Sequence, residues 1–270
     1  MPNFSRSLSI TDIDSQIFFD IHQGDPNTTF WRLSPEEIVF QPDNLDRALE
    51  SHDNKWSPGD ILAELRLNTI IGFTLRQVVE RESDRHTGLK KVKSLGFRQS
   101  VAVEVLYKYE PRRLIGFCDH ILRYWHSSRT FAAVIGGEES RDEVLGVISM
   151  LHHERRTTGR SDCMVYGLAT DGYYFHFVVI DNDSQYSWHT LNWNSQFEQV
   201  EIISQMTRII KHAAGLAVSG GSVNSRRRPD SESFDSWHRR DLASNVGGYA
   251  RVARYCLLVM WNYFLSKASA

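Results

Sequence analysis

A short apolar run between Thr130 and Gly136 restricts the fold of this chain more than any other feature. It reads Phe-Ala-Ala-Val-Ile, and a continuous apolar run of this length is typical of a strand that is buried on both faces of a sheet. Two long helical patterns, 57–82 and 197–214, are available to cover such a sheet. The sequence therefore predicts an α/β protein with a central mixed β-sheet flanked by helices.

The other strands are predicted from changes in hydrophobic period. Valines alternate with other residues over 101–105, which is typical of a strand with one buried face. A turn at 110–113 leads into a second strand, with an interruption at Gly116. Thr170-Asp171-Gly172 predicts a tight hairpin, because a glycine readily adopts the positive φ that such turns need. A helix over 141–155 and a strand over 186–191 complete the expected core.

Length and charge limit the organisation of the chain. It has 270 residues, and 31 Lys and Arg against 33 Asp and Glu give a formal charge of −2. This length allows one large domain or two small ones. The near-neutral charge excludes a strongly basic surface, so nucleic-acid binding requires a local patch. We expect a lead-in over 1–56, a core over 57–215, a flexible linker or loop over 216–236, and a C-terminal helical segment over 237–270 packed on the core.

Neither the cysteines nor the apolar segments indicate secretion or a membrane. Cys118, Cys163 and Cys256 include no Cys-x-x-Cys pair, which argues against a disulfide framework and a zinc knuckle. The N-terminus lacks the apolar centre of a signal peptide. The most apolar stretch, 255–265, is eleven residues long, whereas a membrane span needs about 20. The sequence predicts an intracellular protein of the nucleus or cytoplasm, with no membrane partner.

Asp119 is an acidic residue within an otherwise apolar strand. Its neighbours include Leu114, Phe117 and Ile121, and burial of an unpaired carboxylate is costly. Asp119 therefore needs a partner, which is either a metal ion or a hydrogen-bond donor of the protein. His120 follows it and is expected to point to the opposite face.

The elements around Asp119 follow one another in a recognisable order. Glu64 lies on the first long helix, a Gly-x-x-Asp sequence ends at Asp119, and the apolar strand leads to Glu138 and a second helix before the Asp171 hairpin. Over about residues 57–182 this order resembles the PD-(D/E)XK nuclease superfamily, including its uncharacterised fungal members. The resemblance implies a restriction-endonuclease-like core with N-terminal and C-terminal helical additions, and a metal-dependent endonuclease lineage.

The resemblance also implies roles for three acidic residues. In that family an Asp and a Glu on adjacent strands hold Mg²⁺ or Mn²⁺, and a Lys two residues after the Glu orients the attacking water. Asp119 and Glu138 would be the metal ligands, with Glu64 as a third or outer ligand. Glu138 falls either in the Lys position, after Gly136, or in the Glu position, before Ser140. Neither register keeps the lysine, so the motif is degenerate. Two alternatives stay open: an active enzyme that uses the metal, or an inactive protein that has no cofactor.

The same acidic residues also have structural interpretations. Glu64 can be a solvated residue of its helix, and Glu138 can stabilise the start of the next helix through the helix dipole. Glu143, at a position where the family often carries Gln, can be a surface residue.

Short basic clusters are candidate contacts for DNA or RNA. These candidates are Lys90, Lys91, Arg113, Arg155 and Arg156, since phosphate contacts position a nucleic acid without reading its sequence. Solvated loops are the alternative interpretation. Two functions therefore stay open: a nucleic-acid-binding or -processing protein of nuclease lineage, or a non-catalytic pseudo-nuclease that serves as a protein-interaction module or scaffold. The second would bind a protein partner or form a homodimer through its C-terminal helix.

Overall fold

The computed structural model describes residues 7–25, 29–57, 59–82, 93–95, 99–124, 128–136 and 138–219. All of them fall within one structural unit, Met1–Gly221. The N-terminal elements are β1 (Ser7–Ser9), α1 (Ser15–Phe19), β2 (His22–Gln23) and α2 (Leu45–Asp53), with short 3-10 helices at Ile10–Asp12 and Pro35–Glu37. The elements that follow are α3 (Asp60–Glu82), β3 (Lys93–Leu95), β4 (Gln99–Tyr107), β5 (Glu110–Cys118), β6 (His120–Tyr124), β7 (Ser128–Ile135), α4 (Ser140–Thr157), β8 (Val165–Thr170), β9 (Tyr174–Ile180), β10 (Gln185–Asn192) and α5 (Gln196–Ser219).

The described strands form two mixed sheets, which confirms the predicted α/β class. The larger sheet has seven strands in the order β2-β10-β9-β8-β7-β6-β3, and the smaller has the order β1-β5-β4. In the larger sheet β7 and β8 are parallel, as are β10 and β2, and the other neighbours are antiparallel. Helix α4 makes the crossover from β7 to β8, since parallel neighbours need a long connection.

One long, bent hairpin links the two sheets. Its first arm is β3 followed by β4, and its second arm is β5 followed by β6, with β4 paired to β5 and β3 paired to β6. A single residue, Asp119, separates β5 from β6. The break expected at Gly116 is therefore wrong, because Gly116 lies within β5. A Cβ there would come within 3.1 Å of Ile10, Val147 and Met150 side-chain atoms, so close packing explains this glycine.

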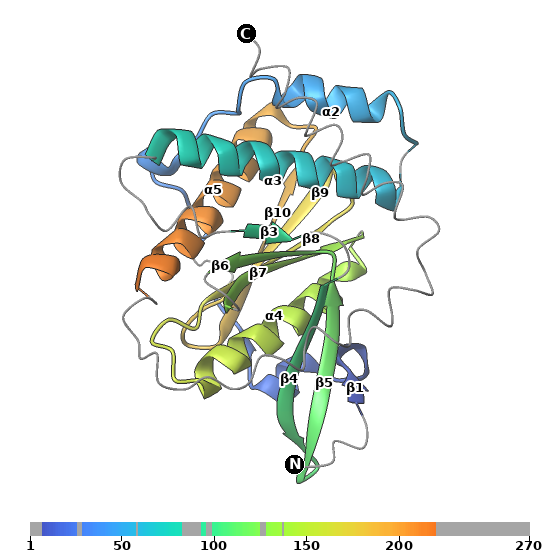
Figure 1. Ribbon diagram of the computed structural model, residues 1–270, viewed down its shortest axis with the longest axis vertical. Coiled ribbons are helices and arrows are strands. Elements are labelled where there is room, and N and C mark those ends of the chain that lie inside the picture. The colour runs from blue at the N-terminus through green and yellow to red at the C-terminus, as the bar shows by residue number, and fades with distance from the viewer. Residues whose placement is uncertain are drawn as a thin grey trace. The chain divides into compact units, whose positions relative to one another are not determined.

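Helices cover both faces of the seven-stranded sheet (Figure 1). Helices α3 and α5 lie on one face, and α4 lies on the other. Each face has its own apolar cluster. Strand β7 contributes Phe131 and Ala133 to the cluster under α3 and α5, and Ala132 and Val134 to the cluster under α4. The prediction of a strand buried on both faces is confirmed.

The N-terminal lead-in contributes two short strands that the sequence pattern does not predict. Strand β1 pairs with β5, and β2 extends the large sheet beside β10. Trp31 is anchored between β10 and α5: its indole N–H donates to Ser187 Oγ at 3.1 Å, and its carbonyl accepts from the Gln205 amide at 2.7 Å. The 3-10 helix Pro35–Glu37 begins with a capping box between Ser34 and Glu37.

Two predicted boundaries differ from the structure. The β4–β5 turn lies at Lys108 and Tyr109, which have φ of 50° and 65°, whereas the predicted turn residues 110–113 belong to β5. Helix α5 continues to Ser219, past its predicted end near Gly215. The expected linker beyond 219 and the segment 237–270 lie outside the described residues, as do Lys90, Lys91 and Cys256.

Candidate functional site

The structure brings Glu64 and Asp119 close enough to interact electrostatically. Glu64 is half-buried near the start of α3, and its Oε1 is buried without a hydrogen-bond partner among the described residues. Burial, together with the negative charge of Asp119, raises the pKa of the Glu64 carboxyl from 4.5 to about 7. Two carboxylates that repel each other in this way favour a proton or a cation beside them.

Asp119 is held at the end of β7. Its backbone N–H donates to the Ala133 carbonyl at 2.8 Å, and its Oδ2 accepts from the Ile135 N–H at 2.7 Å. The side chain is half-buried. Asp119 therefore has the protein hydrogen-bond donor that burial requires, and it also has an acidic neighbour. The hydrogen-bond interpretation of this residue is confirmed for Oδ2, and the metal interpretation stays a prediction.

Arg66 fixes the part of α3 that carries Glu64. It is 2 % exposed; its Nε donates to the Gly172 carbonyl at 2.8 Å, and its Nη1 lies 2.7 and 2.6 Å from the two carboxylate oxygens of Asp53. Its guanidinium also lies 4.4 Å from the ring centre of Tyr173. These contacts tie α3 to the end of α2 and to the β8–β9 turn.

The β8–β9 turn must be glycine at its centre because α3 packs on it. Gly172 has φ of 88°, and a Cβ there would lie 2.9 Å from the Ala63 Cα. The Asp171 carboxylate accepts from the N–H groups of Tyr173 and Tyr174, which closes the turn. The Thr170-Asp171-Gly172 prediction is confirmed, and this turn helps to set the distance between α3 and the sheet.

The strand positions beside Asp119 are apolar. Asp119 bonds to the backbone of Ala133 and Ile135, and both of these side chains belong to the cluster on the α3 side of the sheet. In this register the sequence beside Asp119 is Ala-Val-Ile. It contains neither the acidic residue nor the lysine of the family motif, and both registers considered from the sequence lie further along the chain.

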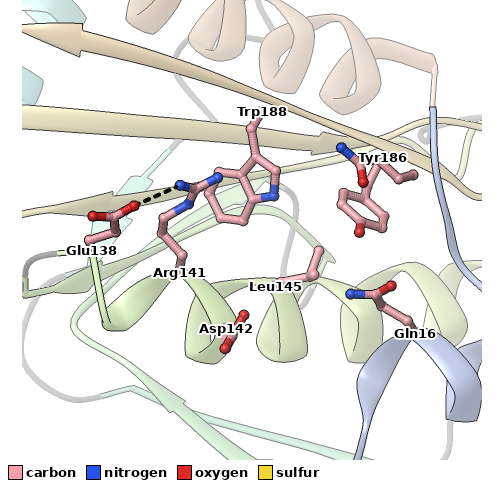
Figure 2. Close-up of a pocket in the computed structure, with 8 residues that line it drawn as sticks. Gln16, Glu138, Arg141, Asp142, Leu145, Tyr186 and Trp188 are labelled. Atoms are coloured by element: carbon pink, nitrogen blue, oxygen red, sulfur yellow. Dashed lines mark hydrogen bonds and ion pairs between the residues drawn. The ribbon is translucent and has the colours of Figure 1, made fainter. Parts of the chain in front are cut away.

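Glu138 lies in a different environment. Its side chain is 81 % exposed and forms an ion pair with Arg141, with a 3.4 Å separation between Nη1 and Oε1. It lines a pocket between α4 and β10 (Figure 2), together with Asp142, Tyr186 and Trp188. Glu138 is not among the charges that act on the Glu64 carboxyl. The structure thus brings together Glu64 and Asp119 and does not join Glu138 to them. Neither Glu138 nor its neighbour Glu139 is the side-chain cap of α4.

The fit of this site to a metal ion rests on two carboxylates. Within the described ranges no three His, Cys, Asp or Glu side chains form a group that could hold a metal. The Oε1 atom of Glu64 is buried without a partner among the described residues, and the pKa of this carboxyl is raised. Both properties are expected of a carboxylate at a cation site that holds no cation. Mg²⁺ is commonly held by one or two carboxylates, with water and substrate phosphate as its other ligands. Glu64 and Asp119 fit that pattern.

The predicted phosphate contacts have different surroundings. Arg155 is 4 % exposed, and its guanidinium donates to the carbonyls of Asp162 and Arg129, so it stabilises the end of α4 and does not face solvent. Arg156 is exposed and donates to Ser184 Oγ at 2.7 Å. Arg113 is exposed on β5. Lys90 and Lys91 are outside the described residues.

Sequence reasoning missed Arg66 and the pocket residues. Arg66 lies between Leu65 and Leu67, both buried, and a charged residue inside an apolar helix stripe is the signal that could have found it. Tyr186 and Trp188 alternate on β10, which places them on one face of the sheet. Their meeting with Arg141 depends on long-range packing that no local pattern encodes.

The comparisons with known proteins leave the family open. No protein-family model matches the chain, and no curated protein has significant similarity to it. None of the described helices is long and apolar enough to cross a bilayer.

Proposed function

We propose that this protein has a restriction-endonuclease-like core and binds nucleic acid through a divalent cation, with its cleavage activity weakened or lost. The observation that carries the proposal is the pairing of Glu64 with Asp119 at the end of β7. Glu64 lies on α3, and Asp119 lies between β5 and β6 beside β7; the resemblance to PD-(D/E)XK nucleases implies a site role for both.

The topology supports this core. A helix, three strands, a second helix and a fourth strand follow in the order α3, β3/β4, β5/β6, β7, α4 and β8. Strand β6 is antiparallel to both β3 and β7, whereas β7 is parallel to β8. This is the element order on which the resemblance rests, and it places Asp119 next to the strand that precedes α4.

The chemistry of the pair favours cation-dependent binding. A bound Mg²⁺ or Mn²⁺ would offset phosphate charge and lower the pKa of a bound water. With a pKa of about 7, Glu64 gives up a proton when a cation binds at neutral pH. Without a cation, the two carboxylates repel phosphate. Asp119 keeps its orientation in both states through its bond from the Ile135 N–H.

The apolar residues beside Asp119 support the loss of cleavage. Ala133 and Ile135 provide no side chain that could orient a water or stabilise a charged transition state. An intact site would need a lysine or an equivalent residue there. Binding without efficient cleavage is therefore the expected outcome.

Metal binding is tested first, by thermal unfolding of the full chain with MnCl₂ or MgCl₂. A metal concentration 100 times its Kd stabilises the folded state by about 2.7 kcal/mol. We expect Tm to rise with metal in the wild type and not in Asp119→Asn. Glu50→Gln, which changes an exposed carboxylate on α2, is the matched control and should respond like the wild type. An equal response of all three proteins would reject the metal site.

Nucleic-acid binding and cleavage are tested separately. Labelled single- and double-stranded DNA and RNA oligonucleotides should bind with metal and lose affinity with EDTA or in Asp119→Asn. Plasmid nicking should be absent or slow. Fast nicking that is abolished in Asp119→Asn would show that the protein is an active nuclease. Oligonucleotide binding that is absent, or that does not depend on metal, would refute the proposal.

A pseudo-nuclease that binds a protein partner is the second candidate. The apolar surroundings of Asp119 and the separate pocket at Glu138 favour it. Its proposed homodimer contact, the C-terminal helix, lies outside the described residues. Oligonucleotide binding that depends on Asp119 would decide against this candidate.

A further inference from the structure

A pocket of about 350 Å³ lies on the α4 side of the sheet, away from the face where α3 carries Glu64. Residues of α1, β2, α4 and β10 line it, among them Gln23, Asp142, Tyr186 and Trp188. The proposed nucleic-acid site does not use any of these residues. Figure 2 shows the aromatic side chains descending from β10 toward the first turns of α4.

Tyr186 has a polar group that the protein leaves without a partner. The residue is 5 % exposed, and Figure 2 shows its hydroxyl directed toward α4. This hydroxyl makes no hydrogen bond within the described part of the chain. The hydroxyl oxygen is not among the buried atoms without a partner, so it opens into the pocket, where a ligand would have a hydrogen-bonding group to contact.

The pocket already holds one guanidinium, that of Arg141. Its central carbon lies 4.4 Å from the ring centre of Trp188, and its Nη1 is paired with Glu138 at 3.4 Å. An indole face and a carboxylate are the two partners that a guanidinium prefers. The intramolecular contact shows that this surface can pair with a guanidinium.

The remaining charge of the pocket lining is negative and belongs to Asp142. Asp14 does not line the pocket and caps α1 by accepting from the Gln16 and Ile17 N–H groups, although its charge also acts on the Tyr186 phenol. Asp142 is exposed and forms no ion pair with a described residue. With Glu138 already paired to Arg141, Asp142 is the lining carboxylate that is left over. It attracts cations and repels phosphates and carboxylates.

We propose that this pocket binds a basic side chain, an arginine or a lysine, from a peptide segment of a partner protein. Asp142 would pair with the incoming cation, the Tyr186 hydroxyl would accept one of its N–H groups, and Gln23 would contact the peptide at the open rim. The proposal commits to a peptide as the source of the cation, and a small free amine is an outcome of the test.

The test is an NMR titration of the full chain with the peptide acetyl-Gly-Gly-Arg-Gly-Gly-amide. The Trp188 indole N–H signal, assigned from Trp188→Phe, reports binding. The same peptide with citrulline in place of arginine keeps the shape and removes the charge. We expect a saturable shift with a Kd of about 1 mM or tighter for the arginine peptide, and no saturable shift with citrulline.

Variants test the two groups that would contact the cation. Asp142→Asn should weaken binding roughly five- to tenfold, and Tyr186→Phe roughly threefold. Glu154→Gln removes an exposed carboxylate from the other end of α4 and should stay within about twofold of the wild type. Equal binding of the citrulline peptide, or equal binding by all three variants, would overturn the proposal. Agmatine binding as tightly as the peptide would also overturn it, because a small amine would then suffice.

Discussion

Replacement of Glu64 by Gln tests the environment that the structure gives this carboxyl. Its pKa in the folded protein is about 7, against 4.5 as its ordinary value. The folded state therefore holds the Glu64 proton more tightly than the unfolded state does. As pH rises from about 4.5 to 7 the unfolded chain loses this proton first, so the wild type loses stability over that interval. Glu64→Gln cannot ionise and avoids this loss.

The size of the effect follows from the two pKa values. The difference between 4.5 and about 7 corresponds to about 3 kcal/mol when Glu64 is fully ionised. Because the side chain is half-buried, water screens part of this penalty, and we expect about 2 kcal/mol. Glu64→Gln should therefore match the wild type near pH 4 and be more stable by about 2 kcal/mol at pH 8.

Urea unfolding at pH 4, 5, 6, 7 and 8, in buffer with EDTA, measures this difference. Glu50→Gln is the matched control, since it removes an exposed carboxylate on α2, and its difference from the wild type should not change with pH in this way. A Glu64→Gln difference that is constant between pH 4 and 8, or that shrinks as pH rises, would refute the reasoning. Divalent metal should reduce the advantage of the variant, because a cation stabilises ionised Glu64.

Three further substitutions test contacts around the site. Asp53→Asn leaves the buried Arg66 without its counter-charge and should lower the free energy of unfolding by about 2–4 kcal/mol, discounted for the partial exposure of Asp53; an unchanged urea midpoint would contradict this. Gly172→Ala strains a residue with φ of 88° and brings a Cβ to 2.9 Å from the Ala63 Cα. The free energy of unfolding should therefore fall by about 1–3 kcal/mol, and Tm by several degrees. His120 is fully buried with both ring nitrogens unpartnered among the described residues, and burial lowers its pKa to about 4. The wild type should therefore lose stability as pH falls below 6.5. The free energy of unfolding of His120→Leu relative to the wild type should be about 2 kcal/mol more favourable at pH 5 than at pH 8. The same difference at both pH values would contradict a buried, uncharged His120.

Local sequence signals predicted the main elements because these elements are long or marked by a distinctive turn. The apolar run before Gly136 becomes β7, and Thr170-Asp171-Gly172 becomes the β8–β9 turn. The missed elements are short or unmarked. Strands β1 and β2 have three and two residues, and their pairing depends on strands more than a hundred residues away. The Lys108–Tyr109 turn has positive φ without Gly, Asn or Asp.

The acidic site was predicted in part for a similar reason. A carboxylate inside an apolar segment identifies Asp119 from sequence, since burial requires a partner, although the structure places it between two strands and not within one. The helical pattern placed Glu64 on α3 without fixing which of its faces meets the sheet, and Arg66 fixes that through contacts with Asp53 and Gly172. Glu138 lies past the end of β7, where the chain turns at Gly136 toward α4; a Cβ at Gly136 would collide with Ser140 Oγ at 1.9 Å. The strand register around Asp119 was thus the decisive unknown.

Asp119 is the only residue between β5 and β6, and its carboxylate is tied to the last residue of β7. The β4–β5 arm is packed on α4 through the apolar cluster that contains Val103 and Leu114. Asp119 is thus the junction between this packed arm and the larger sheet, and a substitution that loosens the arm acts on the acidic residue through a single backbone link.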